Sequence, residues 1–201
     1  MKVKITGLLL IILIVFTSLI PSCGLYVDEG EEGEEDYSYL IKADPAKVDN
    51  ADIPVTPIEE LGITGEPQEI NIDEYRLVVD GLVETPLSLT YEEVTRYPKV
   101  TEKVLCICLG LFANNAVWTG VPVGILLEGA GAENDTYVVF HGADGYRRFI
   151  DISYIEESSV FLAYRVNVQV LPDAHGFPLR VVVEGDYGNE WVKWLERIEV
   201  K

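Results

Sequence analysis

The chain has 201 residues, with 15 Lys and Arg against 34 Asp and Glu, and a formal net charge of −19. A surface this acidic repels nucleic acid and anionic lipid, which excludes nucleic-acid binding and means that an anionic ligand needs a local cationic pocket. About 150 residues remain beyond the N-terminal segments described next, which is enough for one domain.

The N-terminal region has the pattern of an export signal. Two lysines precede an apolar run from Leu8 to Phe16, which is shorter than the roughly 20 residues of a membrane span. Ile20-Pro21-Ser22-Cys23 then resembles the lipobox of bacterial-type lipoproteins. We expect a lipoprotein-type signal peptide over residues 1–22, lipidation of Cys23 and an extracytoplasmic protein anchored to the cell membrane. A plain signal peptide or an uncleaved anchor is the alternative.

An acidic segment follows this signal. Residues 28–36 hold seven acidic residues and two glycines. The like charges repel one another, and no apolar side chain is available for packing. A stretch rich in proline and aspartate runs from Ala43 to Pro57. We expect residues 23–55 to form an acidic, flexible linker and residues 56–201 to form the folded domain.

The first elements of the domain are expected from residue 76 onward. Residues 76–83 predict a strand pair, or a strand followed by a turn, at Asp80-Gly81. Thr90 and Glu93 have the spacing of a capping box, which begins a short helix that ends before Pro98.

Later segments add strands and one more helix. Residues 104–108 predict a strand, and residues 121–128 predict a short helix that ends at Gly129. Further β-branched or aromatic runs predict strands at Tyr137–Phe140, Val160–Arg165, Leu179–Val183 and Val192–Val200. The expected fold class is α+β, mainly β, with mixed sheets and a few short helices.

Two cysteines lie in the predicted strand over residues 104–108. Cys106 and Cys108 are two positions apart, so their side chains share one face, and strand geometry disfavours a disulfide between them. Cys108-Leu109-Gly110 is followed by the turn Trp118-Thr119-Gly120. Taken alone, the two cysteines are typical core residues.

Two polar groups come later in the chain. Phe140 to Tyr146 has the composition of a turn with Asp144-Gly145 at its tip. His175 and Arg180, followed by Trp191-Val192-Lys193, bring basic groups among strand-like runs. Taken alone, these are a loop histidine and cations at a solvated strand edge.

These motifs together resemble the molybdopterin-binding domain of the sulfite oxidase family, over roughly residues 74–201. The resemblance implies the sulfite-oxidase-type fold and a molybdenum–molybdopterin cofactor. It implies that Cys108 is the molybdenum ligand and the catalytic residue, because Cys108-x-Gly110 matches the family motif and Cys106-x-Cys108 does not. A soft thiolate suits such a metal.

The resemblance also implies the cofactor-binding residues. Asp144 is the candidate contact to the pterin, whose N–H groups a carboxylate can accept, and His141 and Tyr146 are weaker candidates. His175 and Arg180 match the family's pterin contacts. The segment Trp191, Val192 and Lys193 matches its phosphate-side contacts, where Arg forks onto phosphate and Lys adds a point charge.

Several positions depart from the family pattern. Thr56–Gly62 contains no His, Arg or Lys, although family enzymes carry a basic or histidine-containing segment there. Residues 111–113 (Leu-Phe-Ala) occupy the place of the arginine that holds sulfite, and Asn167-Val168 replaces Asn-Gly. The active-site tyrosine and the dimerisation domain of sulfite oxidases lie beyond the segment that matches. Sulfite is therefore not the expected substrate.

The expected function is that of a membrane-anchored, extracytoplasmic, molybdopterin-dependent oxidoreductase of the oxo-transfer type. It would act on a small-molecule substrate and exchange electrons with a membrane or haem partner. The alternative is a cofactor-free binding or accessory lipoprotein that retains the fold. Lys2-Val3-Lys4 favours this alternative, because exported molybdenum enzymes usually leave the cytoplasm folded, on twin-arginine signals.

Overall fold

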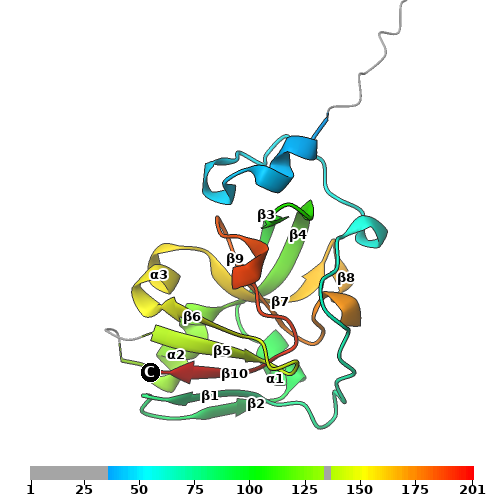
Figure 1. The fold of residues 1–201 in the computed structure, drawn as a ribbon. Helices are drawn as coiled ribbons and strands as arrows, with labels where there is room; N and C mark the ends of the chain where they lie inside the picture. The colour runs from blue at the N-terminus through cyan, green and yellow to red at the C-terminus, as the bar shows by residue number, and fades with distance from the viewer. Residues whose placement is uncertain (1–35, 134–136) are drawn as a thin grey trace, which may run out of the picture. The chain divides into compact units, whose positions relative to one another are not determined.

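Two β-sheets with short helices at their margins make up the part of the chain that the computed structural model describes, residues 36–133 and 137–201 (Figure 1). The expected signal peptide, Cys23 and nearly all of the acidic segment lie outside the described residues. The expectation of a mainly β, α+β fold is confirmed. No helix among the described residues is both long and apolar enough to cross a membrane.

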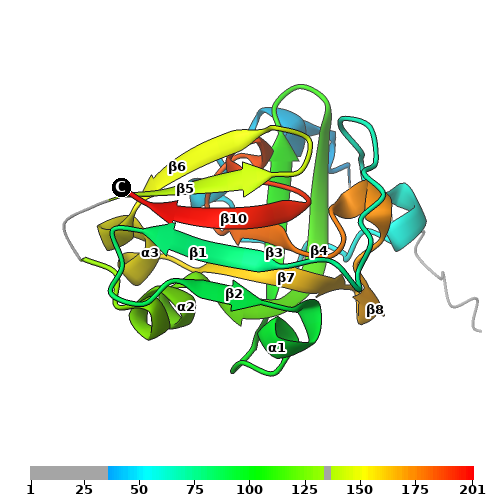
Figure 2. The same cartoon turned by 90° about the horizontal axis from the view of Figure 1, so that it is seen from below.

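The first sheet has the order β2-β1-β10-β5-β6. Its strands are β1 (Leu77–Gly81), β2 (Leu87–Leu89), β5 (Tyr137–Gly142), β6 (Arg147–Asp151) and β10 (Leu195–Val200). β10 pairs in parallel with β1 and antiparallel with β5, so the last strand lies at the centre of the sheet (Figure 2). β1 runs through Asp80-Gly81, and residues 82–86 lead to β2, so this dipeptide is not the tip of a tight hairpin; of the two predicted alternatives, a strand followed by a turn is the one observed.

The second sheet carries the candidate site. Its strands are β3 (Val100–Cys108), β4 (Phe112–Pro122), β7 (Val160–Val166), β8 (Gln169–Val170) and β9 (Arg180–Val183), in the order β3-β4-β7-β8 with β9 also paired to β7. β3 and β4 form a long hairpin in continuous antiparallel register from Val100–Gly120 to Cys108–Phe112. This hairpin crosses the strand direction of the first sheet (Figure 2).

The described helices are short. They are the α-helices α1 (Tyr91–Thr95), α2 (Val123–Ala130) and α3 (Ile152–Glu157), and the 3-10 helices Ser38–Lys42, Pro45–Lys47, Ile58–Glu60, Asp173–His175 and Gly188–Glu190. The capping box at α1 is confirmed: Thr90 accepts the Glu93 N–H and Glu93 accepts the Thr90 N–H. α2 lies two residues later than predicted, because β4 continues to Pro122. Gly131 in the left-handed conformation (φ 65°), not Gly129, ends it.

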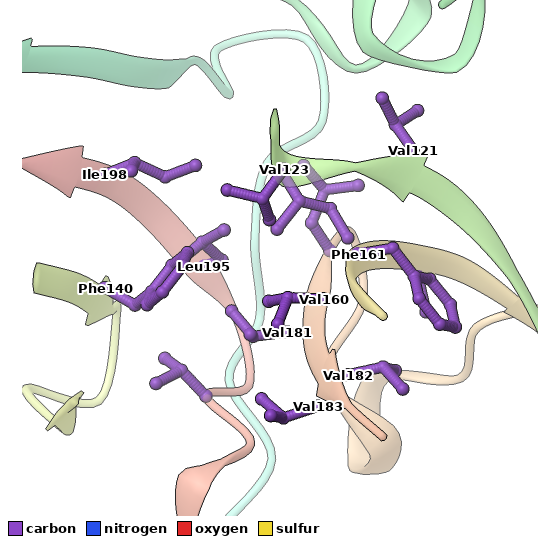
Figure 3. Close-up of a cluster of buried hydrophobic side chains, with 14 of the residues drawn as sticks. Val121, Val123, Phe140, Val160, Phe161, Val181, Val182, Val183, Leu195 and Ile198 are labelled. Carbon is purple, nitrogen blue, oxygen red and sulfur yellow. The ribbon is translucent and has the colours of Figure 1, made fainter. Parts of the chain in front are cut away.

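The core lies between the two sheets. Phe140, Leu195 and Ile198 of the first sheet face Val160 and Val181 of the second sheet (Figure 3). All five side chains are at most 3% exposed. Buried and less buried residues alternate along β5 and β10, as expected for half-buried strands, whereas nearly every residue of β7 and β9 is buried.

Residues 36–65 form an extended strap over the β3–β4 hairpin (Figure 1). A second apolar cluster joins Leu40 and Ile53 of the strap to Leu105 and Ile107 of β3. The side chain of Asn115 donates to the carbonyl oxygens of Asn50 and Ile53, at 3.2 and 2.7 Å. Residues 36–55 therefore belong to the folded unit, and the flexible linker expected over residues 23–55 does not extend through them.

Candidate functional site

The site begins at the thiols of β3. Cys106 and Cys108 point to the same face of the strand and both act on the pKa of Arg180, which places the two sulfurs near its guanidinium. Cys106 is fully buried, and burial raises the pKa of its thiol to about 11, so it is protonated at neutral pH. Cys108 is half-buried at the end of the strand, where a ligand can reach it. The expected absence of a Cys106–Cys108 disulfide agrees with both thiols being free.

Arg180 lies between two tryptophan rings. Its guanidinium carbon is 5.3 Å from the centroid of Trp118 and 5.2 Å from that of Trp191, and the two rings meet edge to face at 5.5 Å. The first residue of β9 thus places its charge inside an aromatic box, where cation–π attraction holds it. Burial lowers the pKa of Arg180, and the nearby Cys106 and Cys108 act in the opposite direction.

His175 and Lys193 lie beside this arginine. Burial, with the charges of Arg180 and Lys193, lowers the pKa of His175 to about 4, so this imidazole is neutral at physiological pH. Burial and Arg180 also lower the pKa of Lys193 to about 8. The Lys193 ammonium donates to the carbonyl oxygens of Thr64 and Ala174 and stacks on the Trp194 ring at 4.1 Å. The charges of Arg180 and Lys193 repel each other, and both disfavour protonation of His175.

Gly176 allows this close approach. It ends the turn Asp173–His175 with φ 110°, a conformation that side chains rarely adopt, and a Cβ there would lie 3.0 Å from Lys193 Cβ. Gly176 is thus a backbone requirement for bringing His175 next to Lys193.

The donors at this site fit an anionic, acceptor-rich group. Arg180 is 9% exposed, and its protein hydrogen bonds in the described part of the chain go to the His175 carbonyl at 3.3 Å and to Cys106 Sγ at 4.0 Å. The buried Nε of Arg180 and Nε1 of Trp118 find no acceptor among the described residues. Buried donors are normally satisfied, and a buried cation is normally paired. A phosphate or pterin oxygen would supply what is missing.

The remaining predicted contacts divide into two groups. Asp144 lies at the β5–β6 turn, where it accepts the Tyr146 N–H, and its charge acts on Lys193, so it belongs to the margin of the site. Trp191 supplies a wall of the Arg180 box, and its indole N–H donates to the Val183 carbonyl. Val192 is fully buried and its carbonyl accepts the Val181 N–H, so its contribution is to position its neighbours.

The two weaker candidates each have a partner within the protein. His141 Nε2 lies 3.2 Å from the Glu199 carboxylate on β10. The Tyr146 hydroxyl donates to the Asn189 carbonyl at 2.8 Å.

Exposed apolar side chains follow Cys108 in the chain. Leu109 and Leu111, at the tip of the β3–β4 hairpin, are 63% and 68% exposed, and Ile63 of the strap is 52% exposed. Phe112 lies against Gly62, where a Cβ would overlap its ring at 2.2 Å. Residues 111–113 therefore place no cation at the position where sulfite oxidases are expected to hold their anion.

Two contributors were not predicted from the sequence. Trp118 was assigned to a turn motif, but it is a wall of the Arg180 box; its place in a Trp-x-Gly motif was the available signal. The carbonyl of Thr64 binds Lys193 from 129 positions away, and no side-chain pattern identifies such a contact.

Comparison with known proteins supports the expected family. The family described as "Oxidoreductase molybdopterin binding domain" matches residues 64–201. "Uncharacterized oxidoreductase YuiH" of Bacillus subtilis is 32% identical, over 68% of this chain and 70% of that protein. An NADPH nitrate reductase of Phytophthora infestans is also 32% identical over 68% of this chain, but the match spans only 18% of the reductase.

A solved structure has a similar fold. The sulfane dehydrogenase SoxCD from Paracoccus pantotrophus matches with a TM-score of 0.69 and 27% sequence identity, over 79% of this chain and 46% of that chain. Like the nitrate reductase, it is therefore longer than the segment that it shares with this chain. The expected sulfite-oxidase-type fold is confirmed.

Proposed function

We propose that this chain is an oxo-transfer oxidoreductase. It belongs to the family of oxidoreductase molybdopterin-binding domains of the sulfite oxidase type. Its cofactor is molybdopterin with molybdenum, in agreement with the expectation from the sequence. The cofactor supplies the two-electron chemistry when bound, and the protein supplies ligation, orientation and charge.

Arg180 is the observation that carries this proposal. A guanidinium that is buried among two tryptophans without a carboxylate costs stability, unless a ligand brings the missing negative charge. A site that binds an anionic group would explain why this buried guanidinium has no carboxylate partner. Lys193 and neutral His175 lie close enough to contact the same group.

Each residue has a role that its surroundings support. Cys108 would hold molybdenum through its thiolate, because it is the more accessible of the two thiols on this face. Arg180 and Lys193 would bind the cofactor's acceptor oxygens, and Asp144 would accept N–H groups of the pterin. Cys106 stays protonated and packs beneath Arg180.

We further propose that the substrate is a small molecule other than sulfite. Leu109 and Leu111, which directly follow Cys108 in the chain, expose apolar surface. These side chains offer no charge to a small oxyanion, whose entry into a protein of net charge −19 would need one.

The location stays a proposal. We propose that residues 1–22 are a signal peptide, that Cys23 carries lipid, and that electrons are exchanged with a membrane or haem partner. The support is the apolar N-terminal run and the lipobox-like Ile20–Cys23. A Cys23→Ala variant should leave the membrane fraction of its host, whereas an unchanged distribution would contradict lipid anchoring.

The cofactor assignment is tested by measuring molybdenum and oxidised pterin in protein purified from its native membrane. We expect about one of each per chain. Arg180→Gln should lower the molybdenum content by about tenfold or more, because each charge-assisted contact contributes about 1.5–3 kcal/mol. Arg147→Gln, which changes an exposed arginine on β6, is the matched control and should keep its molybdenum.

A cofactor-free accessory lipoprotein is the second candidate. The Lys193 ammonium is already held by two backbone carbonyls, so this cation has partners without a cofactor. Native protein that folds but holds no molybdenum or pterin would establish this second candidate and refute the first.

A further inference from the structure

A groove lies on the sheet that carries the thiols, at the end of the β3–β4 hairpin opposite Cys108. It is open and has a volume of about 650 Å³. Side chains of β3, β4, β7 and β8 line its floor, and α1 forms one side. Thr101 of this groove is seven residues from Cys108 along β3, which corresponds to about 23 Å at the rise of a strand. The groove is therefore separate from the proposed molybdopterin site.

The charge in the groove is positive, although the protein is strongly acidic. Lys99 and Arg165 line it, and no acidic side chain is among its lining residues. Arg165 donates to the Val168 carbonyl at 3.3 Å, and neither cation forms an ion pair with a described residue. In a chain with 34 acidic and 15 basic residues, two cations without a carboxylate partner favour binding of an anion.

The floor of the groove presents hydroxyl groups in register. Thr101, Thr119 and Arg165 are opposite one another on β3, β4 and β7, so their side chains share one face of the sheet. The hydroxyls of Thr101 and Thr119 lie 3.0 Å apart and share one hydrogen bond. Because one hydroxyl donates to the other, the second keeps a donor that can point at a ligand oxygen.

The strand β7 is irregular at this point. Thr119 and Gly120 pair with Arg165 and Ala163, so Tyr164 is an extra residue in β7. Such a β-bulge redirects side chains and is common near binding sites. Tyr164 accordingly joins the lining of the groove.

The turn between β7 and β8 has a strained backbone, and its residue Val168 lines the groove. Asn167 and Val168 both have positive φ, 46° and 63°. Asparagine adopts this conformation readily, whereas a β-branched valine rarely does. Val168 is nevertheless 80% exposed, so no packing in the described structure repays the strain. Its side chain and that of Val170 give the groove an apolar wall, and its carbonyl holds Arg165.

We propose that this groove binds a small organic anion, a carboxylate or phosphate ester that carries an apolar body. Arg165 and Lys99 bind the charged head, the hydroxyl pair of Thr101 and Thr119 adds a hydrogen bond, and Val168 and Val170 cover the apolar body. This inference is independent of the proposed oxidoreductase function, because no residue of the groove belongs to the site around Cys108.

Three probes separate the contributions of charge and apolar body: 4-ethylbenzoate has both, acetate has only the charge, and 4-ethylbenzamide has only the body. Each is titrated into ¹⁵N-labelled full-length protein, and amide chemical shifts are followed. We expect 4-ethylbenzoate to bind about tenfold more tightly than either partial probe, with the largest shifts at Thr101, Thr119 and Val170. Equal binding of acetate or the amide, no binding of 4-ethylbenzoate, or shifts that do not centre on the groove would overturn the proposal.

Two substitutions that the fold should tolerate test the binding roles of Arg165 and Val168. Arg165→Gln should weaken 4-ethylbenzoate binding by about tenfold, whereas Arg147→Gln on β6 should leave it unchanged. Val168→Asn tolerates the positive φ, so it should weaken the benzoate several-fold and leave the weak binding of acetate as it was. Wild-type affinity in Arg165→Gln refutes the assignment of the charged head. Molybdenum content should be unchanged in both Arg165→Gln and Val168→Asn, which distinguishes this groove from the site at Cys108.

Discussion

The substitution Gly188→Ala tests how tightly the Cys106 thiol is packed. A Cβ at position 188 would lie 3.0 Å from Cys106 Sγ and 3.4 Å from the Ile107 carbonyl oxygen. Atoms of this size pack at about 3.5–4.0 Å, so β3 or the Gly188–Glu190 turn must shift. Overpacking lowers the free energy of unfolding by about 1–3 kcal/mol. Replacing glycine by alanine at a compatible φ raises it by about 0.4–1 kcal/mol. We expect the free energy of unfolding to fall by about 1–2 kcal/mol.

The assay is urea unfolding of the cofactor-free wild type, both single variants and the double variant with Cys106→Ala. Removal of the sulfur opens the space that the new methyl group needs, so Gly188→Ala should be neutral or stabilising in the Cys106→Ala background. The coupling energy should be about 1 kcal/mol or more. A thermal scan should show a loss of about 2–8 °C for Gly188→Ala alone. Equal effects of Gly188→Ala in both backgrounds would refute the contact and the inward orientation of Cys106.

Three further predictions address the site, a helix and the strap. His175 should titrate near pH 4 by NMR in cofactor-free protein, with His141→Gln used to assign the signal; a pKa near 6.5 would contradict its burial. Because the folded state binds fewer protons than the unfolded state between pH 4 and 6.5, the free energy of unfolding should fall as pH drops through this window, and His175→Asn should remove that part of the fall. Thr90→Ala should cost about 1 kcal/mol of stability by urea unfolding, whereas Thr90→Ser should keep the cap. Asn115→Ala should increase hydrogen exchange within residues 36–65, and Asn189→Ala, an exposed control, should not; an unchanged strap would show that Asn115 does not hold it.

Local patterns in the sequence predicted much of the fold. Runs of β-branched and aromatic residues identified β3, β5, β7 and β9, because such residues favour strands and because strands buried on both faces, such as β7 and β9, are continuous apolar runs. The capping box at Thr90 and the turn at Asp144-Gly145 are also local, since their hydrogen bonds join residues two or three positions apart. Such features need no knowledge of the rest of the chain.

Features that depend on distant contacts were missed or misplaced. Residues 36–55 of the strap were predicted to belong to a linker because the segment is acidic and rich in proline and aspartate, yet Leu40 and Ile53 reach a cluster on β3. The predicted site residues Arg180 and Trp191 do lie together, but the aromatic box also needs Trp118 from β4. Whether Asp144 and Cys108 act as the family resemblance implies stays a prediction.

The central position of β10 has a consequence for the order of folding. β10 pairs with β1, about 120 positions earlier in the chain, and also with β5. The first sheet therefore has a gap in its middle until residues 195–200 are available, whether the chain emerges from a ribosome or through a translocation pore. Pairings of such long sequence separation form slowly. The chain should remain open and exposed to chaperones and proteases for most of its synthesis, and a truncation before Leu195 should prevent folding of the whole domain rather than shorten it.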